Sequence, residues 1–175
     1  GGICWIWNNG LSYAIIPLTE GNLQWSGNSS IGISTGDWKN VFVHEGGGHG
    51  FGKLLDEYHY NDSPNYTAES IESQAWEVPL GLNLTTDFNN TKGSVYWKHL
   101  LNDSRYPRTG FFEGGMGYKS GIWHSEIISC MDDNRLSFNT ISRQLIVERI
   151  KTVAGEPFVI EEFFAKDINY DPLRD

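Results

Sequence analysis

Residues 43–58, VHEGGGHGFGKLLDEY, gather the side-chain types from which a metal-dependent hydrolase is built. Glu45 directly follows His44, and a second histidine, His49, comes soon after. A histidine, a glutamate and a second histidine on one helix form the pattern of zinc hydrolases. Two imidazoles on one helical face can bind a single Zn²⁺, and the intervening glutamate can take a proton from a water at the metal.

The spacing of the two histidines departs from the usual form of that pattern. His44 and His49 stand at positions i and i+5, and at about 100° per residue an α-helix places such residues about 140° apart. Three interpretations are open. A one-residue π-bulge at Gly46–Gly48 returns His49 to the face of His44, or the metal organises a glycine loop, or the histidines bind no metal.

Two acidic residues after the histidines can complete a metal site. Asp56 and Glu57 follow His49 by seven and eight residues, and either would close a three-ligand site with an open position for water, as catalytic zinc sites have. A structural zinc site would need four protein ligands, usually including cysteines. Cys4 and Cys130 are the only cysteines; they form one disulfide or remain free, and they favour no such site.

Three segments resemble one family, the bacterial IgA-peptidase-like zinc metallopeptidases. They are HEGGGHGFGKLLDEY (44–58), FFEGGMGYKSGIWHSEIISCM (111–131) and DDNRLSFNTISRQLIVERI (132–150). Members of this family are metzincin-like zincins, with a methionine turn beneath the metal. The resemblance implies a zinc-dependent endopeptidase for protein or glycoprotein substrates, secreted or in the bacterial cell envelope. The IgA substrate itself does not follow from motifs.

The resemblance also implies roles for individual residues. The metal ligands would be His44, His49 and Asp56, with Glu57 as the alternative to Asp56, while Glu45 would be the general base and acid and Met131 would belong to the methionine turn.

Further residues are candidates for supporting roles. An oxyanion needs a donor, and the candidates for substrate or oxyanion contact are Tyr58, Tyr118 and His124. Glu113 could orient a ligand imidazole from behind. The other two histidines, His59 and His99, have no motif around them.

Composition limits the possible partners. The net charge of −9 and a pI near 4.9 disfavour binding to nucleic acid or to an anionic membrane surface. No apolar run is long enough for a membrane span. The alternative to an enzyme is a zincin-like module without catalysis, whose aromatic residues bind glycan or protein. Glu45 favours the enzyme, because a binding module needs no carboxylate beside the ligand.

Few regular elements separated by long irregular segments predict an α+β fold: a small mixed sheet, an active-site helix and a C-terminal helix. We expect residues 1–155 to be a zincin-like catalytic domain, as the C-terminal part of a larger one whose upstream strands are missing, and 156–175 to be a tail. The predicted elements are strands at 11–18 and 30–35, a helix that begins near Ser34–Asp37 and runs through the motif, a helix at 67–77, a short helix or strand at 95–101, an irregular segment at 104–121 and a helix at 138–153.

Overall fold

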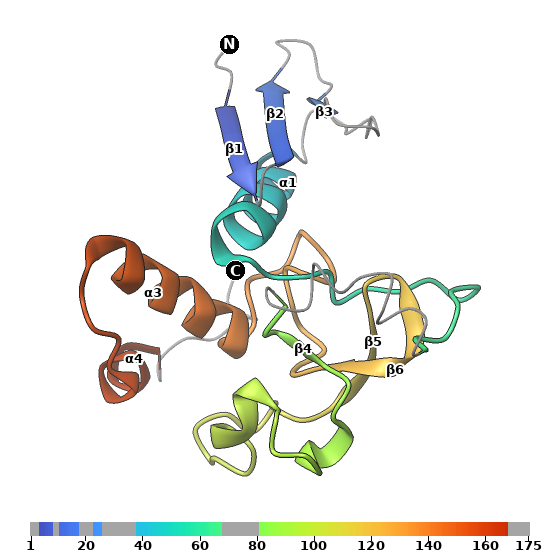
Figure 1. The fold of residues 1–175 in the computed structure, drawn as a ribbon, viewed down its shortest axis with the longest axis vertical. Coiled ribbons are helices and arrows are strands. Elements are labelled where there is room, and N and C mark those ends of the chain that lie inside the picture. Colours follow the sequence, from blue (N-terminus) through green and yellow to red (C-terminus); the bar gives the residue numbers. More distant parts are fainter. Residues whose placement is uncertain (1–3, 9–10, 18–22, 26–37, 68–80, 168–175) are drawn as a thin grey trace.

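The computed structural model describes residues 4–8, 11–17, 23–25, 38–67 and 81–167, and they form an α+β fold. Its first sheet is antiparallel, with the order β1 (Cys4–Asn8), β2 (Leu11–Pro17) and β3 (Leu23–Trp25). β2 confirms the strand predicted at 11–18. In Figure 1 this sheet lies beside the first helix, and β1 contacts the π-helical part of that helix, η1 (Val43–Gly52).

The first helix carries the histidine motif. It begins as α1 (Trp38–Phe42) and continues without a break as the π-helix η1 (Val43–Gly52). Lys53 ends it in a left-handed conformation, with its N–H bonded to the carbonyl of Gly48. The helix predicted through the motif is therefore confirmed. Its predicted start at Ser34–Asp37 lies outside the described residues.

The second sheet is also antiparallel, in the order β4 (Leu84–Thr85), β6 (Tyr118–His124) and β5 (Phe112–Gly115). Met116 and Gly117 join β5 to β6 with φ angles of 52° and 74°, the backbone that a two-residue hairpin turn requires. The prediction that 104–121 is irregular is wrong here, because the glycines belong to a hairpin. The expected mixed sheet is also wrong for the described part of the chain, where both sheets are antiparallel.

The remaining helices are short, apart from one. η2 (Phe88–Asn90) and η3 (Tyr96–His99) are 3₁₀ helices, so the segment predicted as helix or strand at 95–101 is helical. The long helix α3 (Thr140–Ala154) confirms the helix predicted at 138–153, and Ile150 on it is half exposed. The side chain of Asn139 caps the start of α3 by accepting a hydrogen bond from the Ser142 N–H.

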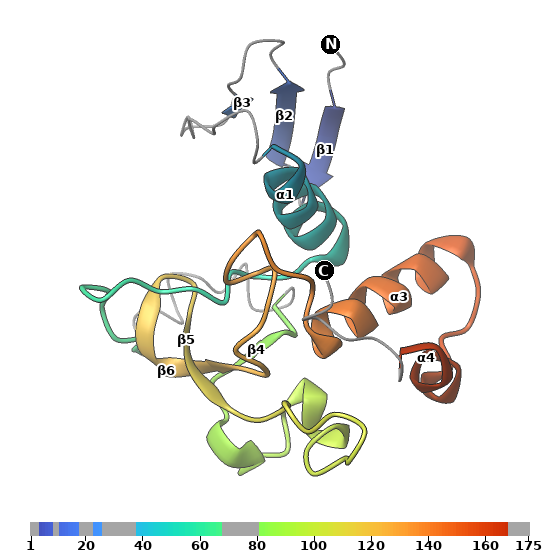
Figure 2. The ribbon, with the colours of Figure 1, turned by 180° about the vertical axis from the view of Figure 1, so that it is seen from behind.

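The chain ends, in the described part, with α4 (Ile160–Asp167), which packs beside α3. Phe163 and Phe164 of α4 are buried, so residues beyond 155 contribute to the core. Seen from behind in Figure 2, α3 and α4 lie on one side of the molecule and the second sheet on the other.

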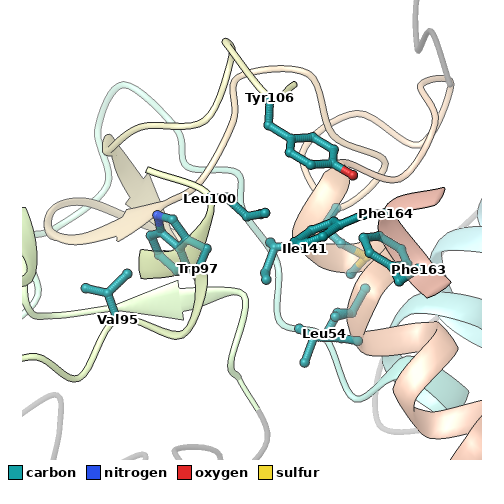
Figure 3. Packing of buried hydrophobic residues seen from close by; sticks show 10 residues of the cluster. Leu54, Val95, Trp97, Leu100, Tyr106, Ile141, Phe163 and Phe164 are labelled. Carbon is teal, nitrogen blue, oxygen red and sulfur yellow. The ribbon is translucent and has the colours of Figure 1, made fainter. Parts of the chain in front are cut away.

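A hydrophobic core joins the segment after η1 to η3, α3 and α4 (Figure 3). Trp97 is fully buried and its indole N–H donates to the carbonyl of Gly110 at 3.0 Å. Leu54, which follows η1, and Met131 lie in the same cluster as α3 and α4, so the end of the motif helix is anchored in the core. The other members of the cluster are Val95, Leu100, Tyr106, Ile141, Leu145, Phe163 and Phe164.

Two predicted elements cannot be compared with the structure. The strand at 30–35 and nearly all of the helix at 67–77 lie outside the described residues. Among the helices that are described, none has the length and apolar character needed to cross a membrane.

Candidate metal centre

The π-helical form of η1 resolves the irregular spacing of the two histidines. In a π-helix the backbone bonds join residues i and i+5, so His49 lies about one turn beyond His44 and not on the opposite face. The two imidazole rings meet edge to face, with centroids 4.9 Å apart. The backbone is neither the one-residue bulge nor the glycine loop among the three interpretations, because the π form extends over the whole segment Val43–Gly52. That the two histidines bind a metal stays a prediction.

Three side chains converge on one point. Nε2 of His44 and Nε2 of His49 lie 3.0 Å and 3.1 Å from the same atom, Oδ1 of Asp56. The three residues each offer one possible ligand atom, and these three atoms all lie within 4.8 Å of one another. The structure thus brings together the two histidines and the first of the two acids that the sequence singled out.

The backbone fixes which nitrogen of each imidazole faces this point. Nδ1 of His44 lies 2.7 Å from the carbonyl oxygen of Cys130, and Nδ1 of His49 lies 2.7 Å from that of Leu54. A carbonyl can only accept, so each Nδ1 carries the proton and donates it. The Nε2 atoms of neutral rings therefore present lone pairs to a carboxylate oxygen. This cluster of electron-pair donors fits a metal cation, and orienting bonds of this kind accompany histidine ligands.

Protonation is the other way to neutralise such a cluster. Burial lowers the pKa of His44, but the hydrogen bonds to Asp56 and Cys130 outweigh it and raise this pKa to about 10. The pKa of His49 is also raised, by Asp56 against burial. Burial raises the pKa of Asp56, and the two histidines lower it well below its ordinary value. The three groups therefore attract positive charge strongly, whether as protons or as an ion.

The two adjacent acids have different surroundings. Glu57 is fully buried behind Asp56, and its carboxylate oxygens accept hydrogen bonds of 2.8 Å from Asn83 and Asn139. Burial raises the pKa of Glu57 to about 7. Its backbone N–H donates to the carbonyl of Met131 at 2.8 Å. Glu57 thus connects the segment after η1 to the start of α3 and to the 129–131 turn, while Asp56 faces the histidines.

The turn that contains Met131 touches η1 directly. Met131 is fully buried, and a Cβ atom placed on Gly48 would lie only 2.4 Å from its Sδ. Because real Cβ contacts are essentially never that short, a side chain at this position of η1 would have to displace the end of the Met131 side chain. The neighbouring Cys130 supplies the carbonyl that orients His44, and its buried thiol is free.

Glu45 opens onto a cleft that also borders His44, one of the three converging side chains. This cleft has a volume of about 570 Å³ and is lined by Glu45, His44, Tyr58 and residues of the 132–135 segment. Burial raises the pKa of Glu45, and the charges of His49 and His44 oppose that shift. Tyr58 is near enough to Asp56 to hydrogen-bond to it; burial and this carboxylate raise the phenol's pKa.

Three other candidates lie elsewhere. Tyr118 does not line this cleft and packs edge to face against Tyr66. His124 is buried in β6, donates through Nδ1 to the carbonyl of Glu126 at 2.9 Å and has its pKa lowered to about 4 by burial. Glu113 accepts from the Gly121 N–H within the β5–β6 hairpin. The idea that Glu113 orients an imidazole is therefore wrong, because backbone carbonyls do so.

Sequence reasoning missed the residues that hold the site from behind. Asn83 and Asn139 are fully buried and bind Glu57. Asn139 also caps α3, and an asparagine at the start of the helix predicted at 138–153 was a usable signal. Asn83 occurs in a turn-like segment, and nothing in its surroundings in the sequence marks it. The carbonyls of Cys130 and Leu54 carry no side-chain signal at all.

Comparisons with known proteins leave the site to be interpreted from its own geometry. No protein-family model matches the chain, and no curated protein sequence matches it.

Proposed function

We propose that this chain is a zinc-dependent endopeptidase. The observation that carries the proposal is the convergence of two imidazole Nε2 atoms and one Asp56 oxygen within 4.8 Å, with both Nδ1 protons held by backbone carbonyls. Three protein ligands from histidine and carboxylate leave one position of a tetrahedral zinc ion open, which is the catalytic form of such a site.

The residues around the ligands supply what peptide hydrolysis needs. A bound zinc ion would polarise the scissile carbonyl and lower the pKa of water toward about 7. Glu45 lies beside His44 in the same cleft, and its raised pKa brings it closer to neutral pH, where a general base works best. Glu45 would accept the proton of the attacking water and deliver it to the leaving amine.

Of the three candidates for oxyanion contact, Tyr58, Tyr118 and His124, Tyr58 is the one that lines the cleft. Its phenol stays protonated at neutral pH because burial and Asp56 raise its pKa. A protonated phenol can donate a hydrogen bond to the oxyanion of the tetrahedral intermediate. Tyr58 would therefore bind the oxyanion, while His124 and Tyr118 have structural roles.

The first test is metal binding by the full chain. After zinc loading and removal of free metal, we expect about one zinc per chain, as a site with one set of ligands requires. His44→Ala and His49→Ala should each lose it. A wild-type chain that folds and retains no zinc would refute the proposal, whatever its activity on peptides.

The second test separates chemistry from binding. Glu45→Gln should keep the zinc and lower kcat for peptide cleavage by about 10²- to 10⁴-fold, the usual effect of losing a general base. The matched control is Glu113→Gln, because Glu113 lies outside the cleft and its amide oxygen can still accept from Gly121. Zinc binding without cleavage in the wild-type chain would instead favour the non-catalytic binding module.

A further inference from the structure

The cleft beside Glu45 has an uneven distribution of charge. Its lining includes the acidic residues Asp132 and Asp133 together with Arg135. Nε and Nη2 of Arg135 bind the two carboxylate oxygens of Asp133 at 2.9 Å and 2.5 Å. This bidentate pair holds the pKa of Asp133 at about 2, so each member neutralises the other.

Asp132 has no such counter-ion. Within the part of the chain that the structure describes, no side chain or backbone donor pairs with its carboxylate. Burial and the charge of Asp133 raise its pKa, and His59 offsets this only in part. Asp132 is an exposed residue of this lining, so a cation can reach its carboxylate from solvent, and its approach relieves the repulsion from Asp133.

The charges of the metal-binding group do not cancel that of Asp132. A divalent cation at the site would be balanced by the carboxylates of Asp56 and Glu45, since the histidines are neutral when they bind metal. Asp132 then carries the uncompensated charge of the cleft. The chain as a whole has a net charge of −9, which favours the approach of basic substrates.

The aromatic lining suits a long basic side chain. Tyr58 and Tyr60 both line the cleft, and their ring centroids lie 5.7 Å apart. Lysine and arginine bury their aliphatic stems on apolar surfaces while the charged end stays near water or an acid. Aromatic rings also attract the cationic group itself.

We propose that the cleft selects peptides with a lysine or arginine within three residues of the scissile bond, and that Asp132 is the residue that determines this specificity. This inference rests on the proposed peptidase function, because it assigns the substrate class of the same site. Asp132 would bind the basic side chain of the substrate and take no part in the chemistry.

The test measures cleavage of pairs of fluorogenic peptides by the zinc-loaded full chain. The two peptides of a pair differ only in having lysine or glutamine at one position. Successive pairs place that position at each of the three residues on either side of the cleaved bond. We expect kcat/KM to be about fivefold higher for lysine at one position, as a partly solvated ion pair gives. Asp132→Asn should abolish this preference, and Asp132→Lys should reverse it toward glutamine.

The matched control is Glu161→Gln, which changes the net charge by the same amount as Asp132→Asn but lies exposed on α4, outside the cleft. It should keep the preference. Cleavage of both peptides at equal rates would overturn the inference and leave the peptidase function standing, and so would a preference that Asp132→Asn does not change.

Absence of any cleavage would count against the peptidase function itself, and the specificity is then judged by binding. Peptide dissociation constants are measured by fluorescence anisotropy with the zinc-loaded Glu45→Gln variant. Tighter binding of the lysine peptide, lost in the Glu45→Gln/Asp132→Asn double variant, supports the basic-residue site. Equal affinities for the two peptides overturn it.

Discussion

The contact between Gly48 and Met131 gives the sharpest prediction about the fold around the candidate metal centre. Alanine at position 48 would place its Cβ 2.4 Å from Sδ and 3.1 Å from Cε of Met131, whereas non-bonded heavy atoms prefer about 3.5–4.0 Å. Met131 is fully buried within the core, so its sulfur cannot move aside without displacing its neighbours. Forcing extra atoms into such a core costs about 1–3 kcal/mol.

Gly47 provides a matched control on the same helix. A Cβ at position 47 would lie 3.6 Å from the ring of Phe138, which is an ordinary contact. Both glycine-to-alanine changes gain the same preference of alanine for a helix, about 1 kcal/mol. The difference between Gly48→Ala and Gly47→Ala in unfolding free energy should therefore equal the clash alone, about 1–3 kcal/mol.

Urea unfolding of the metal-free variants measures this difference, and thermal melts check it. For a chain of this size each kcal/mol shifts Tm by about 2–4 °C. A Gly48→Ala variant as stable as Gly47→Ala would refute the packing of Met131 against η1. If Met131 does pack against η1, Met131→Ala should be less destabilising in the Gly48→Ala background than in the wild-type chain. The expected coupling free energy is at least about 1 kcal/mol.

Two further predictions concern the acids and the buried histidine. Asp56→Asn should lower zinc affinity by more than tenfold in isothermal titration calorimetry. Glu57→Gln should change the affinity less, because Glu57 faces Asn83 and Asn139 and not the histidines. The reverse ranking would make Glu57 the ligand. The pKa of His124 is lowered to about 4 by burial, so between about pH 6.5 and 4 only the unfolded chain holds its proton, and stability is lost as the pH falls through that range. His124→Asn should make the dependence of unfolding free energy on pH shallower there by up to about 1.4 kcal/mol per pH unit, and unchanged slopes in urea titrations would contradict this assignment.

The sequence predicted which three side chains converge better than it predicted the fold that holds them. His44, His49 and Asp56 could be named because their types and order follow known metal chemistry. The geometry that unites them could not be chosen, because a π-helix and a glycine loop both explain three consecutive glycines. The long helix α3 was predictable from its apolar period and its end at Gly155 and Pro157, whereas the β5–β6 hairpin was hidden by glycines that resembled a loop.

The supporting network was out of reach for a physical reason. Glu57 is bound by Asn83 and Asn139, which are 26 and 82 residues away from it in the chain. Such pairs arise only once the core has brought the second sheet and α3 together. The two carbonyls that orient the histidines belong to backbone, which every residue has, so no residue type could signal them.

The arrangement of these carbonyls explains how the ligands hold their positions. Cys130 and Leu54 fix the two imidazoles through Nδ1, and both residues are buried. The ligand atoms are therefore oriented by the fold itself, and the binding of an ion need not pay for ordering them. The fold instead holds two imidazoles and a carboxylate close together. In the absence of an ion, this arrangement is stable only when the imidazoles bind additional protons. Zinc would replace those protons, so its binding should stabilise the segments that supply the ligands and their supports: η1, the loop after it and the turn before α3.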